Sequence, residues 1–137
     1  MATRSYIGTK NTDGTVTYIY CHWDGYPSGV GKTLAEHYTT PTKIEELMKV
    51  GDLSVLDESI GDKQDFSQRI MGTCLAYGRD RGDSNTSAKT RLFENIIKDQ
   101  NVDYIYVFDG DYWECYDTEN PSRIISLYNQ SDTVEKV

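Results

Sequence analysis

"RSYIGTKNTDGTVTYIYCHW", residues 4–23, predicts the element around which the rest of the fold is built. Two runs rich in β-branched and aromatic residues flank Asp13-Gly14, and an Asp-Gly pair between such runs is a strong signal of a β-hairpin turn. Side chains alternate along a strand, so a two-residue turn at this pair divides the hairpin into two faces. One face would hold Ile7, Val16, Tyr18 and Tyr20, and the other Tyr6, Ile19, Cys21 and Trp23.

Helical patterns follow the hairpin. Residues 32–38 and 42–50 are expected to form helices, the second with Thr42 and Glu45 at capping-box spacing and Gly51 just past its end. Residues 52–61 would add a further turn or two of helix. Ser87 would cap a third helix, whose apolar stripe consists of Leu92, Phe93, Ile96 and Ile97.

Strand patterns alternate with these helices. Residues 69–78 predict a middle strand, and residues 103–116 predict a second hairpin that turns at Asp109-Gly110 and places Tyr106 opposite Trp113. Residues 123–128 predict an edge strand, and 129–137 a frayed tail. The predicted class is α+β: an antiparallel sheet of about five strands, built from two hairpins and a middle strand, with about three helices packed on it.

Length and composition limit the function. The chain of 137 residues is expected to form a single domain, residues 1–137, without a secretory signal or an apolar run of the ~20 residues that a membrane crossing needs. Its 3 cysteines, widely spaced, argue against a disulfide framework and favour a cytoplasmic protein. The net charge of −8 argues against direct nucleic-acid binding, which needs a positive face.

"GYPSGVGKT", residues 25–33, resembles a phosphate-binding P-loop only in part. The P-loop pattern places a glycine five residues before the glycine of the Gly-Lys-Thr end, and Tyr26 stands there instead. Pro27 contributes no amide to a phosphate cradle. We therefore expect a strand-to-helix connection here, in which Gly29 and Gly31 either leave the backbone open to an anion beside Lys32 or serve only as turn residues.

Two segments combine aromatic rings with arginines. Residues 20–26 carry aromatic and imidazole side chains, and residues 77–82 read "YGRDRG". Aromatic faces stack on bases and arginine pairs with phosphate, so a pocket between the two segments would suit a nucleotide. The alternative is that the rings are packing residues and the arginines belong to a surface loop. The candidate ligand-binding residues are Arg4, Tyr20, His22, Trp23, Asp24, Tyr26, Lys32, Tyr77, Arg79 and Arg81.

Residues 102–120 contain no lysine or arginine and several carboxylates: Asp103, Asp109, Asp111, Glu114, Asp117 and Glu119. Charge runs of this kind usually form a solvated face. The alternative is an acidic surface that imitates a nucleic-acid backbone and occupies a basic site on another protein.

Catalytic and metal-binding patterns are weak. Cys21 and His22 are neighbours in a strand and point to opposite faces, so they cannot form a dyad. Cys74 could meet His22 only if the fold brings their strands together. His22, Asp24 and His37 lack a recognised metal-ligand spacing, and no catalytic residue, metal or cofactor is predicted.

The sequence resembles a family of small proteins encoded by phages and prophage-bearing bacteria. The residues that carry the resemblance are the T-R-S start, "YCHWDGYP" at residues 20–27 and "YGRDRG" at residues 77–82. The resemblance implies a phage gene product in the host bacterial cytoplasm, with antagonism of host defence as its role. We therefore expect a non-enzymatic protein that sequesters a small nucleotide signal. The alternatives are an acidic inhibitor of a host nucleic-acid-handling or defence protein and, third, a phosphoester-acting enzyme; a site at a homo-oligomer interface also stays open.

Overall fold

The computed structural model describes residues 2–128, and the hairpin at its start forms with a different register from the predicted one. Strands β1 (Ser5–Lys10) and β2 (Thr15–Cys21) are antiparallel, with Lys10 opposite Val16. The connection, residues 11–14, is longer than a two-residue turn because the Asp13 carboxylate accepts hydrogen bonds from Thr15 and, within the connection, only Gly14 adopts a positive φ, +89°.

The predicted faces of this hairpin were therefore wrong by one residue on β2. A slip of one residue moves every side chain of a strand to the other face. Ile7 lies directly opposite Ile19. One face holds Ile7, Ile19 and Cys21, and the other holds Tyr6, Val16, Tyr18 and Tyr20.

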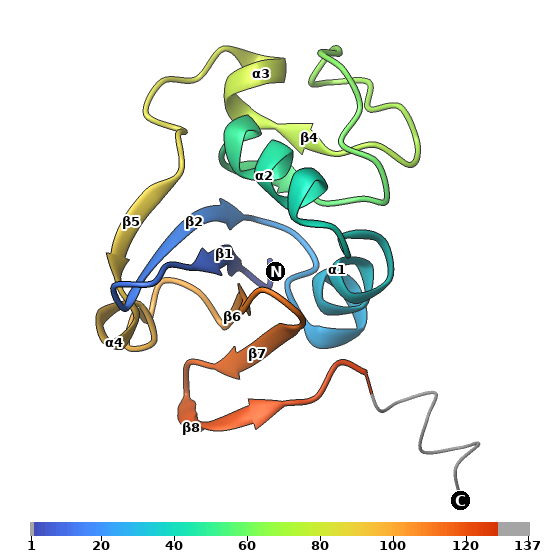
Figure 1. Ribbon diagram of the computed structural model, residues 1–137. Helices are drawn as coiled ribbons and strands as arrows, with labels where there is room; N and C mark the ends of the chain where they lie inside the picture. The colour runs from blue at the N-terminus through green and yellow to red at the C-terminus, as the bar shows by residue number, and fades with distance from the viewer. Residues whose placement is uncertain (1, 129–137) are drawn as a thin grey trace, which may run out of the picture.

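Residues 2–128 form an α+β fold with one 8-stranded sheet, which has more strands than the five predicted and is mixed rather than antiparallel (Figure 1). Its order is β4-β3-β2-β1-β6-β7-β8, with β5 also paired to β2. The pairs β1–β6 and β2–β3 are parallel. The further strands are β3 (Leu53–Val55), β4 (Leu75–Ala76), β5 (Lys89–Leu92), β6 (Tyr104–Phe108), β7 (Trp113–Asp117) and β8 (Asn120–Ile125).

Strand β2 is shared between two neighbours on its outer edge. Its first half pairs with β5, and its last residue, Cys21, pairs with Leu53 of β3. Between the two, the Asp52 carboxylate accepts the amide of Tyr20 at 2.9 Å, so this edge of the strand stays hydrogen-bonded.

The helices differ from the predicted ones mainly at their ends. The described helices are a π-helical turn η1 (Pro27–Gly31), α1 (Lys32–His37), α2 (Pro41–Val50), α3 (Tyr77–Arg81) and α4 (Phe93–Ile96). Helices α1 and α2 match the prediction, but α2 begins after Thr40, whose side chain accepts the amide of Lys43, so the capping box at Thr42 was wrong.

Four further predictions are corrected by the way the strands form and pair. Residues 52–61 contain β3 and no helix, and the middle strand shortens to Leu75–Ala76. The helix predicted from Ser87 is instead β5 followed by the short α4, because the open edge of β2 pairs with Lys89–Leu92. In the second hairpin Trp113 lies opposite Phe108, their ring centroids 5.3 Å apart, and Tyr106 lies opposite Cys115.

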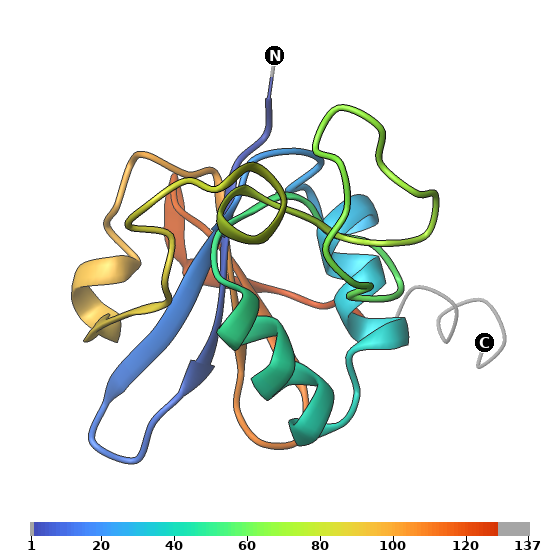
Figure 2. The ribbon, with the colours of Figure 1, turned by 90° about the horizontal axis from the view of Figure 1, so that it is seen from above.

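Both faces of the sheet are covered in part (Figure 2). Helices α1 and α2 lie on one face, over a core that includes Ile7, Ile19 and Tyr106. Helix α4 lies on the other face, over Val16 and Ile105. The second layer covers only one end of its face, so the other end, near Tyr20, is left open beside β3 and α3.

No helix within residues 2–128 is long and apolar enough to cross a membrane. The tail predicted to fray, 129–137, lies outside the described residues.

Candidate functional site

The strongest candidate site is the open end of the sheet face that α4 does not cover. We define the aromatic surface as Tyr20, His22, Trp23, Phe66 and Tyr77, with Arg4 and Arg81. These residues come from the segment directly before β1, the end of β2, the loop before β4, and α3. The fold therefore brings the two sequence-predicted segments, 20–26 and 77–82, to the same part of the molecule.

The first half of the aromatic surface is a continuous row of rings. The Tyr20 hydroxyl and His22 Nδ1 are joined by a hydrogen bond of 2.7 Å, and their ring centroids are 5.9 Å apart. Trp23 packs edge-on against His22 at 4.7 Å between centroids, and 43% of its surface remains exposed. Trp23 thus offers a free aromatic face held in place by its neighbour.

The second half is a stack of two rings under a guanidinium. Phe66 and Tyr77 stack with centroids 5.7 Å apart, and the Arg81 guanidinium lies 4.7 Å and 4.8 Å from the two centroids. Arg81 also pairs with Asp83 at 2.7 Å. The arginine is held over the rings but half of its side chain is exposed, which leaves room for an anion to approach.

Asp52 joins the two halves. Its carboxylate accepts the amide of Tyr20, and its carbonyl oxygen accepts the amide of Tyr77 at 3.2 Å. Sequence reasoning missed Asp52 and Phe66, since both lie in segments that show no strong pattern. The isolated aromatic residue in the polar stretch "KQDFSQR", residues 63–69, was the one available signal for Phe66.

The unpaired positive charge of this surface comes from Arg4, because Arg81 is paired with Asp83. Burial, and then the nearby Arg4 guanidinium, lower the pKa of His22, so its imidazole is neutral at pH 7. Burial raises the pKa of Tyr20, which Arg4 partly offsets. Within residues 2–128, the Arg4 guanidinium has no hydrogen bond or ion pair, and its positive charge is available to a ligand.

Arg79 belongs to a different part of the molecule. Its guanidinium donates to the carbonyls of Ile60, Gly61 and Cys74 and pairs with Asp80 at 2.9 Å. Burial alone would raise the pKa of Asp80, but hydrogen bonds from Arg79 and from backbone amides outweigh it and lower that pKa. The side chain that the sequence offered as a phosphate contact therefore fastens the loop before β4 to α3.

The remaining predicted ligand-binding residues are Asp24, Tyr26 and Lys32, and none of them belongs to the aromatic surface. Asp24 adopts a positive φ of +58° and its carboxylate accepts the Tyr26 hydroxyl at 2.9 Å, so this pair shapes the turn after β2. Lys32 starts α1, on the opposite face of the sheet.

The glycines of residues 25–33 serve packing. The amides of Gly29 and Val30 already donate to the carbonyls of Tyr26 and Asp24. A Cβ on Gly31 would lie 2.8 Å from Leu127 and 3.1 Å from Tyr106, so the residue allows η1 to approach the core. These contacts leave little backbone for an anion at this helix start.

The thiols are arranged for structure. Cys21, Cys74 and Cys115 are free and fully buried. Burial raises the pKa of Cys21 and of Cys115 to about 12, and the Cys74 sulfur contacts the Tyr38 hydroxyl at 3.3 Å rather than His22. Thiols held protonated in this way are poor nucleophiles. Among residues 2–128, no group of three His, Cys, Asp or Glu side chains is placed to hold a metal ion.

The acidic residues of the second hairpin divide between its two ends. Asp103, Asp117 and Glu119 surround a hollow of about 360 Å³ beside the N-terminal residues. Asp109 and Asp111 lie at the opposite tip, where Asp109 accepts two backbone amides of its own turn. Glu114 lies in β7, between these two ends, and its carboxylate accepts the Tyr116 hydroxyl.

Comparison of the chain with protein-family models, with curated proteins and with solved structures finds no match to any of them.

Proposed function

We propose that this chain is a non-enzymatic binding protein that captures a small nucleotide on the aromatic surface. The observation that carries the proposal is that Asp52 joins the Tyr20–His22–Trp23 row to the Phe66–Tyr77 stack, with Arg4 near the first half and Arg81 over the second. An exposed ring provides a face for a base, and the two guanidiniums provide charge for its phosphates.

The rest of the molecule favours a small ligand over a polymer. The net charge of −8 would repel a long phosphate backbone, whereas a single nucleotide meets only the local field of the two arginines. Burial of all three thiols supports binding rather than covalent catalysis. The resemblance to small phage proteins supports the proposed setting, in which capture of a nucleotide signal antagonises a bacterial host defence.

The test is titration of the protein with AMP, ATP and a cyclic dinucleotide by calorimetry, followed by Trp fluorescence. We expect one ligand to bind at micromolar concentration, and Trp23→Ala or Arg81→Ala to weaken it at least about tenfold, since one stacked base contributes ~1–3 kcal/mol. Tyr112→Ala removes a ring at the tip of the second hairpin that is 62% exposed, more than Trp23, and should leave the affinity unchanged. Absence of binding to all three probes at millimolar concentration would refute the proposal.

A second candidate function is an acidic inhibitor that binds a basic surface on another protein. The convergence of Asp103, Asp117 and Glu119 around one hollow favours it. Reversal of Glu119 to lysine should then weaken capture of the partner, while Asp111→Lys at the far tip should not; Asp117 stays unchanged because its carboxylate accepts the Glu119 amide of its own turn. Asp109 is unsuitable for this test because its carboxylate holds the turn together.

A further inference from the structure

The loop between β3 and β4, residues 56–74, ends in an exposed apolar tip. Ile70 is 62% exposed and Met71 81% exposed, and they are adjacent in a loop whose other exposed side chains are polar. A loop of this length without regular strands or helices is uncommon inside a small domain unless it has a function. Single exposed apolar residues need no explanation, but an adjacent pair at a loop tip does.

The tip is a defined turn. The Thr73 amide donates to the Ile70 carbonyl at 3.2 Å, and Gly72, the third residue of the turn, has a φ of +87°. A four-residue turn with positive φ at its third position needs glycine there, and it leaves the second residue, Met71, pointing outward.

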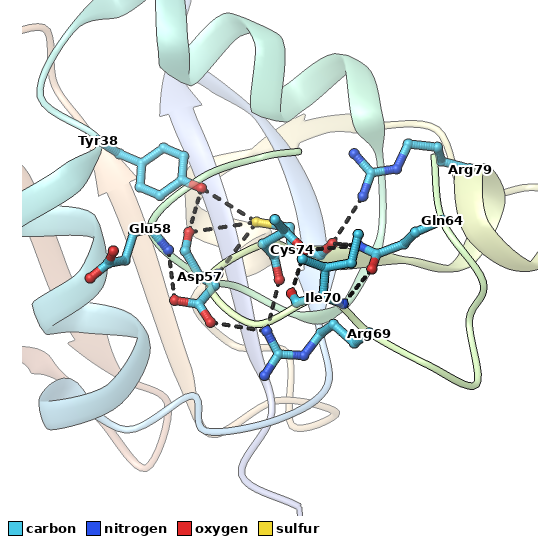
Figure 3. A network of polar contacts seen from close by, with 9 residues as sticks. Tyr38, Asp57, Glu58, Gln64, Arg69, Ile70, Cys74 and Arg79 are labelled. Atoms are coloured by element: carbon cyan, nitrogen blue, oxygen red, sulfur yellow. Dashed lines mark hydrogen bonds and ion pairs between the residues drawn. The ribbon is translucent and has the colours of Figure 1, made fainter. Parts of the chain in front are cut away.

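A polar network holds this turn from behind (Figure 3). The side chain of Gln64 accepts the Ile70 amide and donates to the Thr73 hydroxyl and the Cys74 carbonyl. Arg69, directly before the tip, pairs with Asp57 at 3.0 Å and donates to the Thr73 carbonyl at 2.8 Å. The loop is thereby fixed at both of its ends before any partner arrives.

We propose that Ile70 and Met71 form a preformed docking tip that inserts into an apolar pocket with a basic rim on a partner protein. An ordered loop loses little conformational entropy on binding, so two apolar side chains suffice as anchors. The exposed charged side chains of this loop are the carboxylates of Glu58, Asp62 and Asp65 and the ammonium of Lys63, while Arg69 is paired with Asp57, and this excess of negative charge matches a basic rim. The same charge, with −8 on the whole chain, disfavours a second copy of this chain or an anionic membrane. The proposal does not depend on the nucleotide site.

The experiment places a photo-crosslinking phenylalanine derivative at position 71 of the full chain, in cells in which the gene naturally occurs. We expect a crosslink to one protein whose labelled peptide borders an apolar, basic-rimmed pocket. With that protein purified, Met71→Glu should raise the dissociation constant at least tenfold and leave the urea midpoint of the free chain unchanged. The matched control Ile124→Glu changes an exposed aliphatic residue of β8, at the other edge of the sheet, and should alter neither.

A crosslink confined to a second copy of the chain or to lipid, or no crosslink at all, overturns the proposal, as does an affinity that Met71→Glu leaves intact. Gln64→Leu tests the role of the network, since it removes the hydrogen bonds without removing the tip. It should speed hydrogen exchange at the Ile70 amide and weaken binding severalfold. Wild-type affinity in that variant would show that the tip is not held in advance.

Discussion

Two arginines of the same short helix differ completely in what they hold. Arg79 is 17% exposed and donates to three carbonyls and to Asp80, whose side chain is fully buried. Arg81, two residues further on, lies over two rings at the surface. The sequence "YGRDRG" suggested a shared role for both, because the spacing of residues does not say which side of α3 faces the loop before β4.

Arg79→Ala should therefore lower the free energy of unfolding by about 3 kcal/mol, because it leaves the buried Asp80 carboxylate without its counter-ion. Arg81→Ala is the matched control and should leave the urea midpoint unchanged, since its ion pair is exposed. The measurement is urea denaturation followed by circular dichroism. Equal midpoints for the two variants would contradict the assignment of Arg79 as a structural residue.

At the scale of elements, the sequence predicted where strands and helices occur better than how they pair. Hydrophobic alternation and the Asp-Gly pairs indicated both hairpins, and Gly51 marked the end of α2. Each hairpin was nevertheless out of register, because the carboxylates of Asp13 and Asp109 accept backbone amides of their own turns and lengthen the connections. The pairing of β5 with β2 depends on an open strand edge that no local pattern reveals.

The N-cap of α2 provides a test at this scale. Thr40→Ala should cost about 1 kcal/mol of stability, because the Lys43 amide loses the Thr40 hydroxyl as its acceptor. Thr42→Ala, inside the first turn, should cost nothing, since alanine is a better helix former than threonine. The two thermal midpoints, compared in one buffer, decide between the caps. A larger loss at Thr42 would restore the capping box that the sequence suggested.

At the scale of the whole molecule, the buried acids set how stability varies with pH. Burial raises the pKa of the Cys21 and Cys115 thiols from 9.0 to about 12, and burial also raises the pKa of Tyr38 and Tyr106. Below pH 9 these groups are protonated in both the folded and the unfolded state. Above it the unfolded chain loses protons first, so stability must fall as pH rises.

We expect the urea midpoint to fall steadily from pH 9 to pH 11, with each of the two thiols contributing about 1.4 kcal/mol per pH unit. Cys115→Ala should make the fall of the urea midpoint with pH less steep, although the cavity that the substitution leaves lowers stability at pH 7. At the acid end the sign reverses: the depressed pKa of Asp80 means that its contribution is lost as pH falls below about 4. A midpoint constant up to pH 11 would mean that the thiols ionise in the native state.

The central position of β1 also governs when the chain can fold during its own synthesis. Strand β1 pairs on one side with its immediate neighbour β2 and on the other with β6, in register from Ser5 with Tyr104. The first hairpin closes within microseconds, but the second edge of β1 has no partner until the ribosome has released residues 104–108. For most of translation the nascent chain therefore carries an unpaired strand edge at what will become the middle of its sheet. A truncated mRNA that ends before the codons for β6 yields a chain that cannot complete the sheet. Such a chain is a substrate for proteases and chaperones.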